Sequence, residues 1–197
     1  MSMHRAIAAT ALMGVLLSGC ASSFVKSGLN RLGGPATTAT SVPAAGAPQV
    51  WVTLRSKGIK FSMAKLASDG GVVVWAAKDG SQMALRDGVL INTRGFGWDL
   101  MSAEAPSVAT LAKLGSHKRV YYDLDGTDTM RTHNFDCKAE SGPVTDTPFK
   151  RHIVEHCVGD LGTIENDFWL DSAGHIAQSK QWVSQGVGYA AVAKNEG

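Results

Sequence analysis

Short runs of alternating hydrophobic and polar residues fill most of the chain after residue 51. Runs of this kind, bounded by Gly-containing turns, are typical of antiparallel strands joined by hairpins. The turns are Asp-Gly or Ala-Gly pairs at 69–71, 79–80, 87–88, 125–126 and 173–174. Residues 71–77, 81–86 and 89–94 are close together and predict a meander. Later strands are expected over 118–123, 127–135, 149–158, 163–170, 175–184 and 187–193.

One segment lacks this alternation. Residues 98–114 are rich in Ala, Leu and Met, which favours one or two short helices. Pro106 is expected to interrupt any helix there. The predicted fold is therefore mainly β, a single antiparallel β-sandwich or incomplete barrel with one or two short helices, over residues 51–197.

The start of the chain has a different pattern. An apolar run from Ala6 to Leu17 follows Arg5, and it is shorter than the roughly 20 residues needed to cross a bilayer. A basic start, a short apolar stretch and a small-residue exit predict a signal peptide over residues 1–19. The sequence Leu-Ser-Gly-Cys at 17–20 then has the form of a lipobox. An ordinary signal peptide with a chance cysteine is the alternative, and the spacing favours lipidation of Cys20.

A lipidated Cys20 makes the membrane a partner of the protein. Its acyl chains exceed the roughly two-chain requirement for stable anchoring. Ala21 stands at the second mature position, where no aspartate is present. We therefore expect the protein at the periplasmic face of the outer membrane. Residues 20–50 are expected to form the lipidated N-terminus and a flexible tether, because they have few large apolar groups to bury.

Secretion also determines how the other two cysteines and the charge are interpreted. In an oxidising compartment Cys137 and Cys157 are expected to form a disulfide, with two buried thiols as the alternative. The formal net charge is +2, and it falls when Arg5 leaves with the signal peptide. A charge this small gives no electrostatic footprint for nucleic acid. No cofactor is expected beyond the covalent lipid.

Residues 152–156 read HIVEH, the H-x-x-E-H pattern of one class of zinc peptidase. The pattern needs a helix, where residues four apart share a face. Here Ile153 and Val154 favour a strand, on which His152 and His156 face one side and Glu155 the other. We therefore expect no metal site.

Residues 165–171 read ENDFWLD and place several polar residues on one strand face. Neighbouring carboxylates on such a face lie about 6.5 to 7 Å apart. This overlaps the roughly 6.5 to 9.5 Å used by inverting glycosidases. A carbohydrate hydrolase using Asp167 and Asp171 is therefore an alternative, but any acidic i, i+2 pair on a strand has this spacing. We expect a solvated strand face and no catalytic residue.

Five tryptophans remain, and core filling is the commonest use of tryptophan in strands. The same rings can also stack on sugar faces, and Trp98 and Trp182 are the two for which both uses stay open. The five are Trp51, Trp75, Trp98, Trp169 and Trp182.

Two long motifs resemble one known family. They are VVVWAAKDGSQMALRDGVLINTRGFGWDLMSA (72–103) and ENDFWLDSAGHIAQSKQWVSQGVGY (165–189). With the lipobox and the paired cysteines, they resemble the YjbF/GfcB (YmcC-like) lipoproteins. Thr93 and Arg94 match the residues before that family's Gly-rich turn, whereas Phe168 stands where members often have tyrosine. The resemblance implies a place beside the machinery for capsule and exopolysaccharide export and carries no catalytic residue.

The predicted function combines the anchor, the β domain and this resemblance. We expect an outer-membrane-anchored periplasmic lipoprotein that acts as a non-enzymatic accessory or scaffold for exopolysaccharide or group 4 capsule secretion. Its partners would be polysaccharide export proteins or the polysaccharide itself. A general envelope-maintenance lipoprotein is a further alternative to the hydrolase. The residues expected to contact a partner are Trp98, Asp99, Trp169, Gln181 and Trp182.

Overall fold

A computed structural model describes residues 45–144 and 148–194 of the chain. The predicted signal peptide, Cys20 and most of the predicted tether lie outside the described residues. The first described strand, β1, begins at Gln49, two residues before the expected start of the β domain. None of the helices in the described ranges has the length and apolar character to cross a membrane.

Within these ranges the chain forms twelve strands and two short helical segments. They are β1 (Gln49–Leu54), η1 (Arg55–Lys57), β2 (Ile59–Asp69), β3 (Val72–Ala76), β4 (Gln82–Arg86), β5 (Val89–Arg94), β6 (Leu100–Glu104), α2 (Val108–Ala112), β7 (Ser116–Leu124), β8 (Met130–Ser141), β9 (Arg151–Gly159), β10 (Gly162–Leu170), β11 (Ile176–Ser184) and β12 (Gly188–Lys194). The Asp-Gly turns join β3, β4 and β5 as the expected meander.

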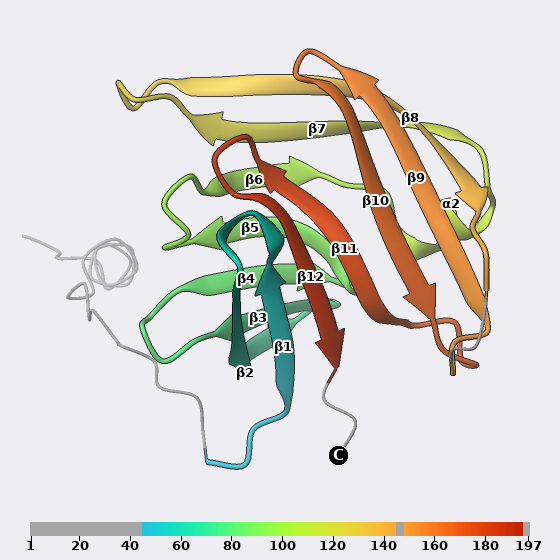
Figure 1. The fold of residues 1–197 in the computed structure, drawn as a ribbon, viewed down its shortest axis with the longest axis horizontal. Helices are drawn as coiled ribbons and strands as arrows, with labels where there is room; N and C mark the ends of the chain where they lie inside the picture. Colours follow the sequence, from blue (N-terminus) through green and yellow to red (C-terminus); the bar gives the residue numbers. More distant parts are fainter. Residues whose placement is uncertain (1–44, 145–147, 195–197) are drawn as a thin grey trace, which may run out of the picture. The chain divides into compact units, whose positions relative to one another are not determined.

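All twelve strands belong to one antiparallel sheet in the order β5-β4-β3-β2-β1-β12-β11-β10-β9-β8-β7-β6 (Figure 1). Consecutive strands pair, except β5 with β6, and β1 also pairs with β12. The two strands that end this order, β5 and β6, follow each other in the chain and lie side by side. Asn92 of β5 donates a side-chain hydrogen bond of 2.7 Å to the Met101 carbonyl of β6. The sheet is therefore nearly closed as a barrel, which confirms the predicted fold class.

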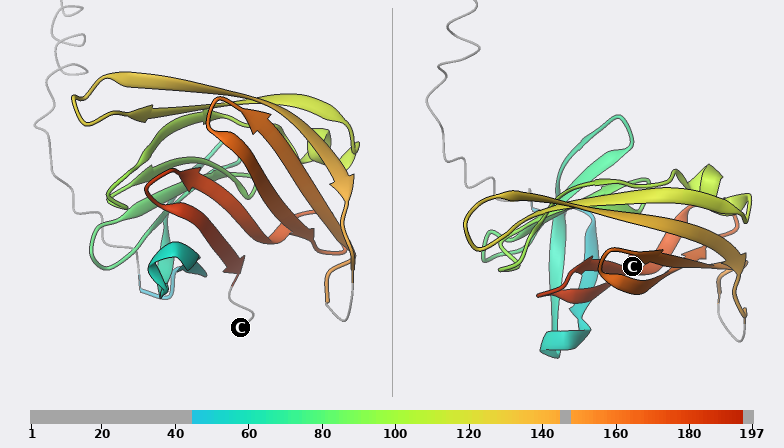
Figure 2. Two further views of the ribbon diagram at one scale, coloured as in Figure 1. Left: turned by 45° about the horizontal axis from the view of Figure 1, so that its top comes forward. Right: turned by 90° about the horizontal axis from the view of Figure 1, so that it is seen from above.

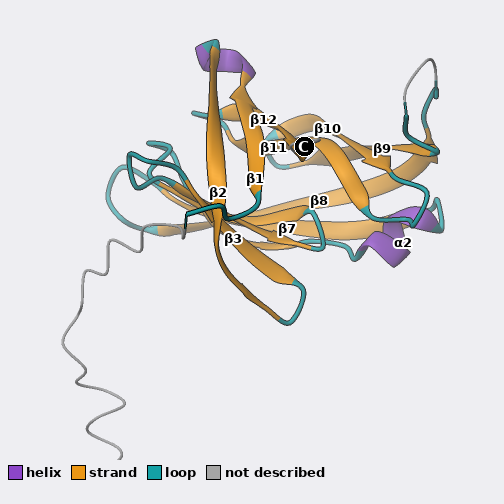
Figure 3. Ribbon diagram, turned by 90° about the horizontal axis from the view of Figure 1, so that it is seen from below, coloured by secondary structure: helices purple, strands orange, loops and turns teal. Residues whose placement is uncertain are grey.

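The sheet is flattened into two facing layers. Figure 2 shows β9–β12 in one layer and β4–β8 in the other. Strand β2 joins them, because residues 59–64 pair with β1 whereas residues 64–69 pair with β3. Figure 3 shows β2 running between the β1 side and the β3 side of the molecule. One long strand thus carries the hydrogen-bonded ladder around the corner.

Two groups of buried apolar side chains fill the space inside. The larger lies between the layers and includes Val52, Met63, Met83, Phe135 and Trp182. The smaller lies next to the short helix α2 and includes Leu111, Ile153, Phe168 and Leu170. Ser107 begins α2 by accepting a hydrogen bond from the Thr110 amide, which satisfies one of the free amides of the first turn. The helix therefore covers one end of the interior.

Residues 98–114, expected to form one or two short helices, are helical only in their second half. Strand β6 takes up the first half, and only α2 is helical. Leu100 and Ala103 are buried, and the ladder to β7 shifts register between Leu100 and Ser102. The shift disrupts the alternation that would have indicated a strand. Pairing with β7 outweighs the helix preference of Ala, Leu and Met.

Candidate functional site

Asp99, one of the residues expected to contact a partner, holds the turn between β5 and β6. Its carboxylate accepts hydrogen bonds from the amides of Gly95 (2.8 Å) and Phe96 (2.9 Å) and from the Thr93 hydroxyl (3.0 Å). Thr93 Oγ1 accepts in turn from the Leu100 amide (2.9 Å). Gly95 has a φ of 83°, a conformation that favours glycine. The Thr-Arg-Gly-Phe-Gly-Trp-Asp-Leu motif therefore brings the two ends of the sheet together.

Trp98 lies on this same turn and is not a core residue. It is 58% exposed. Its ring nevertheless lies against Gly186, where an added Cβ would be only 2.3 Å from Trp98 Cγ. Its carbonyl accepts a hydrogen bond of 2.6 Å from the Ser184 hydroxyl. Trp98 thus docks the β5–β6 turn on the turn that follows β11.

Gln181 also has a structural role, because it connects the two layers. Its Nε2 donates to the Gly88 carbonyl at 2.9 Å, and its Oε1 accepts from the Leu90 amide at 2.8 Å. It is 2% exposed. A single amide from β11 therefore satisfies two backbone groups at the start of β5, an edge strand of the sheet.

Trp182 is buried, so it cannot stack on a sugar in this structure. Its ring packs edge-on against Tyr121, with 4.9 Å between centroids, and lies 6.1 Å from Phe135. Its amide donates to the Asn166 side chain at 2.7 Å. The ladder between β10 and β11 extends only as far as Asp167 and Lys180, and Asn166 replaces the missing backbone partner. Core filling is therefore the observed role of Trp182.

The disulfide prediction is confirmed. Cys137 of β8 and Cys157 of β9 are direct cross-strand partners, and their sulfurs are bonded. Both residues are buried in the larger core. The bridge thus joins two neighbouring strands of the β domain.

A buried ionic cluster lies beside this disulfide and was not foreseen from the sequence. The Glu155 carboxylate receives two hydrogen-bonding nitrogens of Arg119, with Nη2 3.0 Å from Oε2 and Nε 3.2 Å from Oε1. His117 Nε2 lies 2.6 Å from Oε1, and the Asn166 amide donates to Oε2 at 2.7 Å. Arg119 is 1% exposed and Glu155 is fully buried. Both oxygens of the Glu155 carboxylate therefore have hydrogen-bond partners within the protein.

Electrostatics explains why Glu155 stays ionised there. Burial alone would raise the pKa of its carboxyl, but the Arg119 charge and the hydrogen bonds from His117 and Asn166 outweigh burial, so the pKa is lowered. Ligand atoms of His117, Cys137 and Glu155 lie within 4.8 Å of one another, as in a metal site. However, the Cys137 sulfur is bonded to Cys157 and is not available as a thiolate ligand. The cluster is therefore a structural ion pair. The zinc-peptidase pattern also fails here, because β9 is a strand with His152 and Glu155 on opposite faces.

The outer face of β1 and β9–β12 carries a different arrangement, which we call the outer row. Successive cross-strand pairs place its members side by side across five strands: Trp51, Ala193, Gln178, Trp169 and His152. Three strand spacings separate the two tryptophans, which corresponds to about 14 Å. Trp51 is 40% exposed. Two aromatic rings thus flank a strip made of alanine and glutamine.

Charged groups surround the outer row. Lys60 lies over the Trp51 ring, with 4.9 Å from its Nζ to the centroid. At the other end the imidazole of His152 stacks on Trp169, with 4.5 Å between centroids and 6° between planes. His152 Nε2 lies 2.9 Å from Asp167, whose other oxygen is 2.6 Å from Lys180 Nζ. Each tryptophan ring of the outer row is therefore packed against a basic side chain, Trp51 against Lys60 and Trp169 against His152.

Of the residues expected to contact a partner, Trp169 is the one that belongs to the outer row. Trp51 was missed as a surface residue, although the sequence holds a signal for it. In the segment QVWVTL, Val50, Val52 and Leu54 share one phase and are buried, whereas Trp51 shares the phase of Gln49 and Thr53. Polar residues at alternate positions mark that phase as the solvent side.

The two carboxylates of the hydrolase alternative are engaged in structural contacts. Asp167 is 7% exposed and lies between Lys180 and His152. Asp171 accepts hydrogen bonds from the amides of Ala173 and His175, both at 2.9 Å, and so holds the turn between β10 and β11. These amides, above all that of His175, lower the pKa of the Asp171 carboxyl. A glycosidase acid needs a raised pKa.

Comparison with known proteins determines the family. The family model described as group 4 capsule polysaccharide lipoprotein gfcB, YjbF, matches residues 31–192. The chain belongs to the YjbF family. This confirms the resemblance, and it identifies an envelope lipoprotein of a capsule-associated family that is not a known enzyme family. No curated protein sequence matches the chain significantly.

A solved structure supports the same fold for this YjbF family member. It resembles the crystal structure of the hypothetical lipoprotein YmcC from Escherichia coli K12 with a TM-score of 0.65 and 14% sequence identity. The similarity covers 77% of this chain and 85% of that one. At this identity the comparison establishes the common fold alone.

Proposed function

We propose that the protein is a non-enzymatic accessory lipoprotein of exopolysaccharide or group 4 capsule secretion, which contacts the sugar polymer through the outer row. The match to the capsule lipoprotein family over residues 31–192 is the observation that carries the proposal. The outer row adds a surface with the chemistry that a polysaccharide needs. The family match therefore supports the pathway, and the chemistry of the outer row supports the proposed contact surface.

The outer row suits a sugar chain for three reasons. Tryptophan faces stack on the apolar faces of sugar rings, and here the faces of Trp169 and Trp51 that His152 and Lys60 do not cover would do so. The small side chain of Ala193, between Trp51 and Trp169, leaves room for a polymer to lie across the strands. Gln178 and the neighbouring Lys180 and Lys60 supply hydrogen-bond donors for sugar hydroxyls. An extended polymer can thus contact both rings at once, with several sugar units between them.

The structural contacts that Asp167 and Asp171 make support a binding role over hydrolysis. General acid catalysis requires a carboxyl group whose pKa is raised towards the working pH. Asp171 has the opposite shift, and Asp167 lies against a lysine at 2.6 Å. Neither group has the environment of a glycosidase acid.

Replacing a ring of the outer row should weaken binding to the secreted polysaccharide. Trp169→Ala and Trp51→Ala should each lower the affinity for the purified polymer about fivefold to tenfold, because each removes a stacking platform worth about 1 kcal/mol or more. Titration calorimetry measures this. Trp98→Ala is the matched control, because Trp98 is more exposed than Trp51 but lies outside the row; its affinity should stay unchanged.

The same variants can be tested in cells that lack the gene. Wild type should restore surface polysaccharide, and the Trp51→Ala, Trp169→Ala double variant should restore less. Unchanged polysaccharide in the deletion strain, with crosslinks only to cell-wall synthesis proteins, would favour the envelope-maintenance alternative. Loss of polymer processing in a folded Asp167→Asn, Asp171→Asn variant would favour the hydrolase.

The proposal includes an outer-membrane anchor at Cys20 on the periplasmic face. The lipobox ends at this cysteine, and Ala21 follows it. Labelling of growing cells with a palmitate analogue should mark the wild-type protein and miss Cys20→Ser. Sucrose-gradient fractionation should place the labelled protein with the outer membrane. Equal labelling of the two proteins would contradict the anchor.

A further inference from the structure

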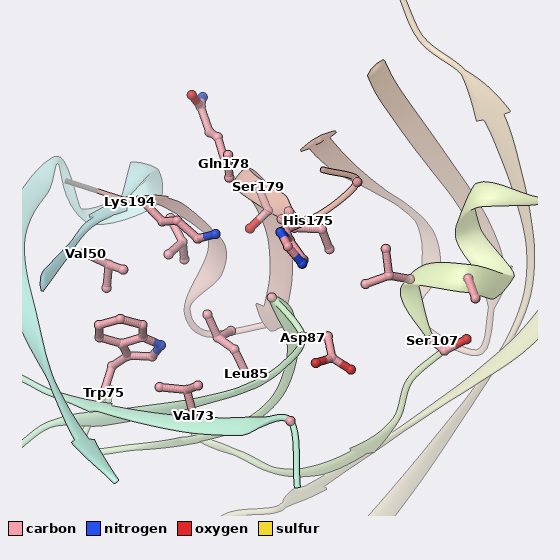
Figure 4. A pocket seen from close by; sticks show the side chains of 18 residues that line it. Val50, Val73, Trp75, Leu85, Asp87, Ser107, His175, Gln178, Ser179 and Lys194 are labelled. Atoms are coloured by element: carbon pink, nitrogen blue, oxygen red, sulfur yellow. The ribbon is translucent and has the colours of Figure 1, made fainter. Parts of the chain in front are cut away.

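An open pocket of about 500 Å³ lies between the two layers, on the inner side of the strands that carry the outer row (Figure 4). It lies between β3 and β4 on one side and β11 and β12 on the other. This volume falls within the range of about 300 to 1,000 Å³ that is typical of small-molecule sites. Gln178 borders both the pocket and the outer row, and the other residues of the outer row do not line the pocket.

The interior of the pocket is mainly apolar. Val50, Val73, Trp75, Leu85 and Val192 line it (Figure 4). A sugar placed here would bring several hydroxyl groups against surfaces that offer them no partner, and each unpaired hydroxyl is costly. A hydrocarbon chain would instead gain about 0.8 kcal/mol for each buried methylene. The lining therefore selects an apolar ligand body.

One polar atom inside this lining has no partner. Trp75 Nε1 is buried and, among the described residues, makes no hydrogen bond. The nitrogen faces the interior of the pocket in Figure 4. An unsatisfied buried donor is costly, so a ligand oxygen at this position would relieve it.

A positive charge borders the same end of the pocket. Lys194 is the direct cross-strand partner of Val50, and both line the pocket with Trp75. Lys194 makes no ion pair within the part of the chain that the structure describes, although its charge contributes to the lowered pKa of the Asp171 carboxyl. The acidic lining residue Asp87 comes from the turn after β4, and Figure 4 shows it at the opposite end. The Lys194 end thus suits an anionic head group, and the remainder suits a hydrocarbon chain.

We infer that this pocket binds one long acyl chain with a carboxylate head, the head lying between Lys194 and Trp75 Nε1 and the chain lying between the layers. The inference does not depend on the proposed function, because it uses other residues and another side of the sheet. Charge complementarity at Lys194, the unpaired indole N–H and the apolar interior each point to this ligand.

Photoaffinity labelling tests the inference on the full chain. The protein, purified from membranes and placed in phospholipid nanodiscs, is irradiated with a palmitate analogue that carries a diazirine along its chain. We expect adducts in peptides from β3, β4, β11 and β12. Palmitate should compete with the probe about twofold to fivefold better than hexadecanol, which lacks the charge, and Lys194→Gln should remove this difference.

Two pocket-filling variants and one control complete the experiment. Val73→Trp and Ala177→Trp place bulk in the pocket from opposite layers, and each should lower the adduct yield at these peptides at least tenfold. Val158→Trp, at an exposed position on β9, should leave the yield unchanged. Circular dichroism confirms folding of each variant. Unchanged adducts in both folded filling variants, or competition by purified polysaccharide in place of palmitate, would overturn the inference.

Discussion

Arg119→Ala should lower the free energy of unfolding by about 3 to 5 kcal/mol, the cost of breaking a buried ion pair by removing one partner. The substitution leaves the Glu155 carboxylate fully buried, with the hydrogen bonds of His117 and Asn166 but without its cationic partner. Urea denaturation followed by tryptophan fluorescence measures the change. The midpoint should fall strongly while the slope of the transition stays the same.

The adjacent residue provides the control. Lys118 lies next to Arg119 on β7 but faces solvent, where it pairs with Asp136, and both side chains are more than 80% exposed. Exposed pairs contribute little to stability. Lys118→Ala should therefore leave the urea midpoint almost unchanged. If Lys118→Ala and Arg119→Ala had equal effects, the buried pair would not be the source of the stability.

The same ion pair predicts a pH dependence. The pKa of Glu155 is lowered in the folded protein, so its contribution to stability is present above the unfolded pKa, near the ordinary glutamate value of 4.5. It is lost as the pH falls through the lower folded pKa. As the pH falls below the ordinary glutamate pKa, wild type should thus lose stability more steeply than an Arg119→Met, Glu155→Leu variant that lacks the pair. Parallel pH profiles would contradict this assignment.

Removal of the disulfide has the second large expected effect. The double variant Cys137→Ala, Cys157→Ala should lose about 3 kcal/mol of stability, the chain-entropy value for a loop of this length. The two cysteines are 20 residues apart in the sequence. Their position in the core adds a small loss of packing. Thermal and urea denaturation of the oxidised wild type and the variant give the difference.

Reduction of the wild-type protein separates the covalent effect from the packing effect. The reduced protein keeps both sulfur atoms, so it should lose most of the stability that the double variant loses. A reduced wild type as stable as the oxidised form would show that the bridge adds no stability. Because both sulfurs are buried, the reductant must be applied during partial unfolding.

The sequence predicted well what depends on neighbouring residues in the chain. Asp-Gly pairs located the β3–β4–β5 hairpins, and alternation in Thr163–Leu170 gave β10 almost to the residue. Alternation also placed Glu155 on the face of β9 opposite His152 and His156, and in the structure Glu155 is buried. Alternation could not identify Arg119, which lies 36 residues earlier, as the partner of Glu155. The period of a strand indicates which face a residue is on, but not which residues of other strands lie next to it.

The outer row was beyond sequence reasoning for the same reason. Its two rings are separated by 118 positions in the chain and come together only through the registers of β1, β12, β11 and β10. Gln181 and Trp182 show a second limit. They are adjacent in β11 yet both are buried, because the β10–β11 ladder ends at Lys180 and the period of two is interrupted.

The pairing of β1 with β12 has a consequence for how the protein is made. The first strand forms backbone pairs with the last, from Val50 with Lys194 to Leu54 with Ala190. Contacts between residues so distant in sequence slow folding, because a large loop must close before they form. The ladder cannot be completed until the C-terminal strand has left the ribosome and, for a secreted chain, the export channel. Translocation in an unfolded state is therefore compatible with the topology, since the last strand to emerge completes the fold.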